Sequence, residues 1–256
     1  LLMLFSAVIH AESQPVRSLS AKTIHIAAID WCPQLCPLEG TSGFPNEHPG
    51  YLLELAQEVF KGSGYELEVK VYPWSRAIHM VQNGKALALL APAKEEAPGL
   101  VYPLQAIGTQ KMCFFTRADS QWQYDGLADL NDQSIGALYD AELGEVRPYF
   151  DEHRGQFTLI SVDNDYVHRG LKMLAAKRLD SFIFPYAATQ YVIKSTLKAE
   201  HFKIAGCLTP SDVFMAFTPK SEEQGQVGVL QRLFDRRIQQ LEQSGYIAAL
   251  LSRYGL

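Results

Sequence analysis

Two of the four cysteines, Cys32 and Cys36, lie four residues apart in the stretch DWCPQLCP, just after a short apolar run. Cysteines at this spacing can hold a metal ion, form a redox pair or close a disulfide. A structural zinc site needs four ligands, but the sequence has no second CxxC or CxxH motif and its histidines are scattered singly. A redox role needs an exposed, activated thiolate, and no neighbouring residue supplies one. We therefore expect a disulfide that closes a small loop held by Pro33, with no bound metal and no cofactor.

The first nine residues, Leu1 to Ile9, are apolar or small. They are too few to span a bilayer, but they match the apolar part of a secretory signal, with cleavage after Ala11. The alternative is a buried strand. We expect residues 1–11 to be the remnant of a signal peptide and the protein to be periplasmic. The even number of cysteines then favours disulfides, because an exported protein folds in an oxidising compartment.

The composition is that of a folded globular protein. With 256 residues, of which 47% are apolar and 20% charged, the chain can bury a sizeable core and form one large or two small domains. The formal net charge is −5, and the sequence contains no run of basic residues. This charge distribution argues against a nucleic-acid partner.

Strand patterns alternate with helix patterns along the chain. The expected strands are 23–30, 66–73, 86–91, 134–139, 157–162, 179–185 and 202–208. The expected helices lie within 50–65, 75–84, 142–153, 165–178, 187–197 and 227–256. Because strands joined by helices of this length form parallel sheets covered on both faces, the sequence predicts an α/β protein with two lobes.

Several short motifs follow one another in a distinctive order. The chain has Gly50-Tyr51 at the start of a helix that contains Leu53 to Ala56, Trp74 after a strand, and Asn-Gly-Lys at 83–85 before Leu87-Ala88. It continues with GLADLNDQSIGAL, KRLDSFIF, VFMAFTPK and LEQSGYIAALLSRYG. Together these motifs resemble the bacterial extracellular solute-binding proteins of family 3, the periplasmic receptors of ABC transporters for polar amino acids. The resemblance spans essentially the whole mature chain.

This resemblance implies the two-lobe, type II periplasmic-binding-protein fold. Each lobe would be a mostly parallel sheet covered by helices, and a ligand in the cleft would be enclosed by bending at two hinge strands. Lobe 1 would comprise residues 20–106 plus 212–256, and lobe 2 would comprise residues 107–211.

The expected hinge also bears on the other two cysteines. The chain would cross between the lobes near 106–108 and again near 209–213. If these two strands run antiparallel, Cys113 and Cys207 would face each other and form a disulfide at the base of lobe 2. The alternative is two buried free thiols.

Ligands of open α/β sheets bind beyond the carboxyl ends of the strands. Aromatic rings there supply apolar faces with little entropy loss, and a fixed cation gives directional recognition of an anion. By this rule and the resemblance, the candidate ligand-binding residues are Trp31, Tyr51, Trp74, Arg76, Pro92, Lys94, Tyr139, Ala141 and Tyr186. Each has an ordinary structural alternative, such as core packing, a helix start or a solvated surface position. The Cys32–Cys36 disulfide would fix the loop that carries Trp31.

Three positions depart from the amino-acid receptors of the family. Glu96 falls near the arginine that pairs with the α-carboxylate, Pro185 near the aspartate that accepts from the α-ammonium, and residues 139–141 replace a Gly-Thr pair. An unpaired charge in a dry cleft is costly, so we predict weak or no binding of the standard amino acids. Arg76 and Lys94 would instead anchor an anionic group, with aromatic rings stacking on its body.

The function predicted from the sequence is extracytoplasmic capture of a small polar, anionic or aromatic solute in the interlobe cleft. The protein would serve an ABC transporter or act as a stand-alone receptor, as a monomer and without catalysis. An ABC permease and a membrane sensor are the candidate partners. One alternative is a ligand-sensing partner of a membrane signalling protein. A second is a periplasmic dehydratase, for which Glu142 is the plausible acid, although it has no evident polarising neighbour in the sequence.

Overall fold

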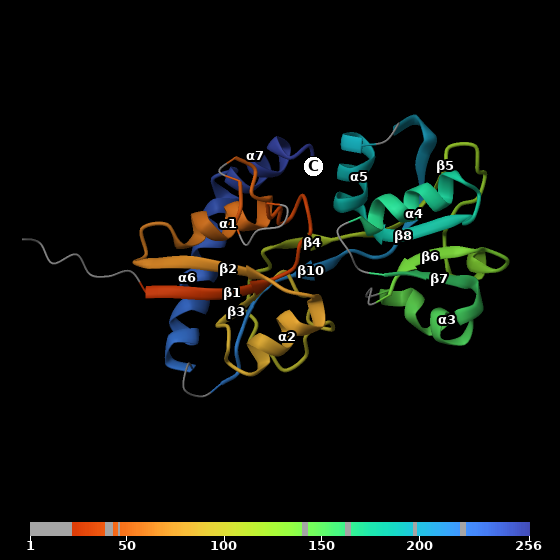
Figure 1. Ribbon diagram of the computed structural model, residues 1–256. Coiled ribbons are helices and arrows are strands. Elements are labelled where there is room, and N and C mark those ends of the chain that lie inside the picture. Colours follow the sequence, from red (N-terminus) through yellow and green to blue (C-terminus); the bar gives the residue numbers. More distant parts are fainter. Residues whose placement is uncertain are drawn as a thin grey trace, which may run out of the picture.

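The computed structural model describes residues 22–38, 43–45, 47–139, 143–161, 165–196, 199–220 and 224–256. The expected signal segment 1–11 lies outside the described residues, as do Ala141 and Glu142. The described elements form two lobes, each built on its own β-sheet, with a two-stranded connection between them (Figure 1).

The first lobe contains a four-stranded sheet in the order β11-β3-β1-β2. Its central strand β1 is parallel to β2 and β3, whereas β11 is antiparallel to β3. The strands are β1 (Lys22–Ala28), β2 (Tyr65–Val71), β3 (Ala88–Leu90) and β11 (Met215–Phe217). The helices are α1 (Tyr51–Phe60), α2 (Trp74–Gln82), α6 (Gln224–Gln243) and α7 (Tyr246–Arg253).

Helices cover both faces of this sheet. Successive side chains of a strand point to opposite faces, and the carboxyl-terminal half of β1, residues 26–28, is apolar and buried on both. Ile24 and Ile26 pack with α1, α6 and α7, whereas Ala27 packs with Ala77 and Val81 of α2. This two-sided burial is the arrangement that the alternating strand and helix patterns predict.

The second lobe contains a five-stranded sheet in the order β7-β6-β8-β5-β9. Its strands are β5 (Met112–Arg117), β6 (Ile135–Leu138), β7 (Phe157–Ile160), β8 (Ser181–Pro185) and β9 (Phe202–Cys207). The helices α4 (Tyr166–Ala175) and α5 (Tyr186–Thr196) pack on one face, and α3 (Arg147–Glu152) packs on the other. Four 3₁₀ turns are Leu127–Leu130, Gly144–Val146, Arg154–Gln156 and Ala199–His201.

Two short strands join the lobes. β4 (Gly108–Gln110) and β10 (Ser211–Val213) pair antiparallel, with Gly108 opposite Val213 and Gln110 opposite Ser211. Their residue ranges overlap the segments 106–108 and 209–213, where the sequence analysis expects the chain to cross between the lobes. The antiparallel direction that the second disulfide requires is therefore present.

Both expected disulfides are present. Cys113 on β5 faces Cys207 on β9, and their bond closes a segment with a sequence separation of 94. Cys32 and Cys36 are bonded to each other across a separation of four. No free cysteine occurs in the described part of the chain.

Three features of the second lobe differ from the sequence-based expectation. β5 was not expected as a strand, although it is almost entirely buried. Only half of the strand pairs in this sheet are parallel. β5 brings the chain in from the hinge and β9 leads it back, so each runs antiparallel to its neighbours.

The helix expected within 142–153 is a 3₁₀ turn followed by the short α3. Gly144 has φ 49°, which regular helix does not allow, and Pro148 lies in the first turn of α3, where its missing N–H costs nothing.

Among the helices of the described residues, none combines the length and the apolar composition of a membrane span.

Candidate ligand-binding site

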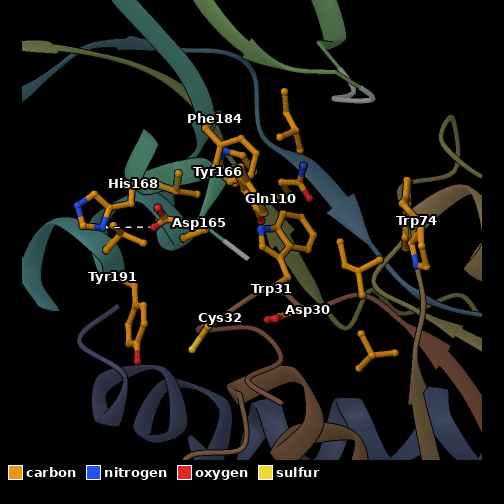
Figure 2. A pocket seen from close by; sticks show the side chains of 18 of the residues that line it. Asp30, Trp31, Cys32, Trp74, Gln110, Asp165, Tyr166, His168, Phe184 and Tyr191 are labelled. Carbon is orange, nitrogen blue, oxygen red and sulfur yellow. Dashed lines mark ion pairs between the residues drawn. The ribbon is translucent and has the colours of Figure 1, made fainter. Parts of the chain in front are cut away.

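A cavity of about 610 Å³ lies between the two lobes (Figure 2). The first lobe lines it with residues just after β1 and around the end of β2, and the second lobe lines it with the ends of β6 and β8 and with α4 and α5. Gln110 of the connecting strand β4 also lines it. The cavity therefore lies beyond the carboxyl ends of parallel strands from both sheets, and its volume is within the usual range of ligand sites.

The loop that carries Trp31 is fixed by several backbone contacts. Trp31 and Leu35 exchange N–H···O hydrogen bonds of 2.9 Å, and the Cys32–Cys36 disulfide spans the same turn. The first two N–H groups of α1, which have no partner within the helix, donate to the carbonyls of Pro33 and Gln34 at 3.0 Å. The disulfide thus clips the loop, as expected, and α1 anchors it to the first lobe.

Gly50 makes this anchoring possible. It precedes α1 with φ 114°, and a Cβ atom at this position would collide with the backbone of Gln34. The close approach of loop and helix therefore requires glycine. In the sequence, the Gly50-Tyr51 pair was singled out only through the resemblance.

Trp31 reaches across the cleft. Its side chain packs against the apolar cluster of the second lobe that contains Phe184 and Leu171. Its indole Nε1 is buried and has no hydrogen-bond partner, and the same is true of Oε1 of Gln110. Both residues line the cavity, so the site presents one neutral donor and one neutral acceptor to a solute.

Other aromatic rings line the same space. Trp74 at the start of α2 lies across the cavity from Trp31, and Tyr166 and Tyr191 of the second lobe lie on the opposite side (Figure 2). Tyr166 meets Phe184 edge-to-face, with 5.2 Å between ring centroids. Burial, together with the negative charge of nearby Asp30, raises the pKa of Tyr166, so its hydroxyl stays neutral and available as a donor.

Three carboxylates line the cavity. An oxygen of Asp165 lies 3.5 Å from Nδ1 of His168, and a carboxylate oxygen of Glu96 accepts a 2.8 Å hydrogen bond from the backbone N–H of Ala93. Partial burial of its carboxyl group raises the pKa of Asp30, which lies two residues after the end of β1. No group of three or more metal-ligating side chains suited to a metal ion occurs among the described residues.

Only two of the predicted ligand-binding residues, Trp31 and Trp74, line the cavity. Tyr51 is a core residue of the first lobe, with 7% of its surface exposed. The Arg76 guanidinium lies 5.4 Å from the ring centroid of Tyr72, and the Lys94 ammonium lies 4.7 Å from that of Phe214. Their cationic groups are thus placed over rings rather than in the cavity lining.

The three remaining candidates that the structure describes do not line the cavity either. Pro92 is buried, and its carbonyl accepts from the N–H of Phe214 at 3.0 Å. Tyr139 is 67% exposed. Tyr186 follows β8, where its N–H donates to the carbonyl of Lys111 at 2.7 Å. Ala141 lies outside the described residues.

Two of the departures from the resembled family do line the cavity. Glu96 and Pro185, at the positions of the family's carboxylate-binding arginine and ammonium-binding aspartate, both contribute to its wall. Sequence reasoning missed Gln110, Asp165, Tyr166, His168 and Tyr191. The strand-end rule could have indicated the residues after β7, whereas nothing local marks Gln110 or Tyr191.

Comparison with solved structures identifies the architecture. A histidine kinase sensor domain with similarity to periplasmic binding proteins superposes with a TM-score of 0.67 and 18% identity, covering 92% of this chain and 96% of that one. The periplasmic-binding-protein fold is thereby confirmed.

Two further structures show the same fold. An amino acid ABC transporter substrate-binding protein from Streptococcus pneumoniae, bound to L-arginine, has a TM-score of 0.66 and 19% identity over 91% of this chain and 94% of that one. The ancestral amino-acid-binding protein AncCDT-1, a precursor of cyclohexadienyl dehydratase, has a TM-score of 0.67 and 14% identity, with 91% and 94% covered. No family model matches the chain, and no curated protein matches it.

Proposed function

We propose that the protein is an extracytoplasmic solute-binding protein, similar to those of family 3, that captures a small solute between its lobes. The observation that carries this proposal is the cavity of about 610 Å³ lined jointly by both lobes and the connecting strand β4. A solute there contacts both lobes at once, so its binding energy favours the closed arrangement over any open one.

The proposed lobe boundaries are residues 20–106 plus 212–256 for lobe 1 and 107–211 for lobe 2. The separate sheets, the separate apolar clusters and the β4–β10 pair between them support this division. Two disulfides support an oxidising compartment. We propose the periplasm, reached through a signal peptide, and a monomer that delivers its solute to an ABC permease.

Sensing is the second candidate function, because the fold is shared with a histidine kinase sensor domain. In that case the protein would act on a membrane signalling partner rather than on a permease. Dehydratase activity is a weaker candidate, which turnover of a prephenate-like acid would support. We propose that the protein is not an enzyme.

The test is a thermal-shift screen of small solutes with the mature protein. A solute at about 100 times its dissociation constant adds about 2.7 kcal/mol to the free energy of unfolding. For a chain of this size, the melting temperature should rise by about 5–10 °C.

Tryptophan fluorescence gives an independent readout and a matched control. Trp31 and Trp74 line the cavity, whereas Trp122 packs against Phe114 in the second lobe and its indole N–H donates to the carbonyl of Asp129. A bound solute should change the emission of the wild-type protein and of Trp122→Phe. Trp31→Phe with Trp74→Phe should abolish the change. A broad screen without any shift in melting temperature or emission would refute solute capture.

A further inference from the structure

The cavity has an unusual charge distribution for a receptor of amino acids. Among the described residues that line the cavity, the acidic and basic ones are Asp30, Glu96, Asp165 and His168. No lysine or arginine contributes to the described lining. A ligand carboxylate would therefore enter a site that contains three carboxylates and at most one positive charge, and that charge is already adjacent to Asp165.

The nearest sequence candidates for a cation do not alter this distribution. Arg76 and Lys94 each place their charge over an aromatic ring, and neither contributes to the cavity lining. Leaving a ligand carboxylate without a cationic partner in such a site costs several kcal/mol. The lining therefore disfavours both anions and zwitterions.

Asp30 differs from the other two acids. Glu96 accepts a hydrogen bond from the chain, and Asp165 has His168 beside it. Within the described part of the molecule, the side chain of Asp30 makes no hydrogen bond and no ion pair. Figure 2 shows its carboxylate below the Trp31 ring, with Trp74 farther away on the right. It is an unpaired carboxylate at an exposed residue on the rim of the cavity, and the partial burial of the group still raises its pKa.

The rings around Asp30 suit a cation as well. Ammonium and guanidinium groups are attracted to the faces of tryptophan and tyrosine, most strongly to tryptophan. Trp31, Trp74, Tyr166 and Tyr191 line the cavity. Tyr72 lines it too, but the Arg76 guanidinium already lies 5.4 Å from the centroid of its ring. The same rings supply apolar area for the body of the solute.

We propose that the cavity binds an organic cation that carries no carboxylate, with its ammonium or guanidinium group at Asp30 and its body among the aromatic rings. The unpartnered Trp31 N–H donates to a hydroxyl or carbonyl where the solute has one. This inference rests on the proposed function, because it names the class of solute that the same cavity captures. It reverses the charge expected from the sequence, which relied on Arg76 and Lys94.

The test compares solutes that share a body and differ only in charge. 2-Phenylethylamine is phenylalanine without its carboxylate, and 3-phenylpropionate is phenylalanine without its amine. Agmatine and arginine form a second pair with a longer, guanidinium-bearing body. Calorimetric titration of the mature protein should give at least tenfold tighter binding of each amine than of its amino acid, and no binding of 3-phenylpropionate.

Three variants test whether the carboxylate of Asp30 is the group that pairs with the bound cation. Asp30→Asn keeps the shape of the side chain and should weaken amine binding at least tenfold. Arg76→Gln should not weaken it, because a positive charge beside Tyr72 is not a partner for a cation. Glu66→Gln removes one negative charge from an exposed position on β2 that does not line the cavity, so it controls for the general loss of charge. Unchanged melting temperatures for the two controls establish that they are folded.

The outcomes separate this inference from the proposed function. If phenylalanine, arginine or 3-phenylpropionate binds more tightly than the matching amine, the assignment of a cation is wrong but solute capture stands. Amine binding that is unaffected by Asp30→Asn refutes the role of Asp30. If a broad screen of amines, amino acids and organic acids gives no binding at all, both the inference and the proposed function fail.

Discussion

The two lobes contribute different chemistry to the same cavity. The first lobe presents the unpaired carboxylate of Asp30 and the indoles of Trp31 and Trp74. The second lobe presents a largely apolar wall around Phe184, and its cavity acid Asp165 is already beside His168. Under the proposed function, this difference predicts that the first lobe selects the solute by charge, whereas the second lobe covers it.

The disulfides follow the same division. In the first lobe, Cys32–Cys36 closes a tight turn next to the cavity. In the second lobe, Cys113–Cys207 joins two adjacent strands near the hinge and closes a segment with a sequence separation of 94. One bond therefore shapes the site, and the other stabilises a lobe.

Removing either disulfide should lower stability, but the disulfide whose loss costs more stability should cost less affinity. By chain entropy, the loss of Cys113–Cys207 through paired alanine substitutions costs about 5 kcal/mol of unfolding free energy, and the loss of Cys32–Cys36 costs about 2 kcal/mol. Urea unfolding measures both values. Solute affinity should fall more in the Cys32/Cys36 variant. Equal losses of stability, or greater loss of affinity in the other variant, would contradict the division.

Truncating one ring from each lobe sharpens the comparison. Trp31 is anchored by its clipped loop and packs across the cleft, whereas Tyr191 on α5 is 43% exposed. Trp31→Ala should cost about 2 kcal/mol of binding, about 30-fold in affinity. Tyr191→Ala should cost less than about 1 kcal/mol, as is usual for a partly exposed contact. Calorimetry with the solute found in the screen measures both, and a larger effect of Tyr191→Ala would place recognition on the second lobe.

The pH dependence of solute affinity should also show that recognition depends on the first lobe. Burial raises the pKa of Asp30 in the folded protein, so affinity for a cation should be greatest at neutral pH and fall as the pH drops through that raised value. Glu96, Asp165, His168 and Tyr166 face the same cavity, and comparison with Asp30→Asn separates their contribution from that of Asp30. The variant should lack this part of the decline in a calorimetric pH series.

The raised pKa of Asp30 also makes the stability of the ligand-free protein depend on pH. The folded state holds the proton of Asp30 more tightly than the unfolded chain does, so the associated stability is present at low pH and is lost as the pH rises through the folded-state pKa. Asp30→Asn should therefore melt slightly above the wild type at pH 7, and the difference should vanish below about pH 4. A lower melting temperature of the variant at pH 7 would mean that the ionised carboxylate stabilises the fold.

Much of the fold was predictable from the sequence because its signals are local. The apolar runs at β1, β3 and β8 and the amphipathic pattern of α1 each occur within one element. β5 was missed because it follows the hinge without a preceding helix and pairs with strands far away in the chain.

The site was less predictable because it depends on contacts between lobes. Trp31 and Trp74 were found by their positions after strands. Gln110 and Tyr191 reach the cavity only through the relative placement of the hinge, α5 and the first lobe. Arg76 and Lys94 follow strands closely enough to satisfy the same rule, but nearby rings hold their charges in other positions.

The smallest expected effect concerns the movement that brings the lobes together. They touch through Trp31 and through a 3.3 Å hydrogen bond from the Lys194 ammonium on α5 to the carbonyl of Gly255 after α7, which face each other across the cleft (Figure 1). Each lobe has its own sheet and core, so movement should occur mainly at the β4–β10 pair, as a rigid-body closure.

Small-angle X-ray scattering should show a smaller radius of gyration when the screened solute is added to the wild type. Trp31→Ala should show less compaction at equal saturation, because the ring that spans the cleft is gone. A radius that does not change in either protein would mean that the lobes are already closed without solute and that selection occurs through the entry path instead.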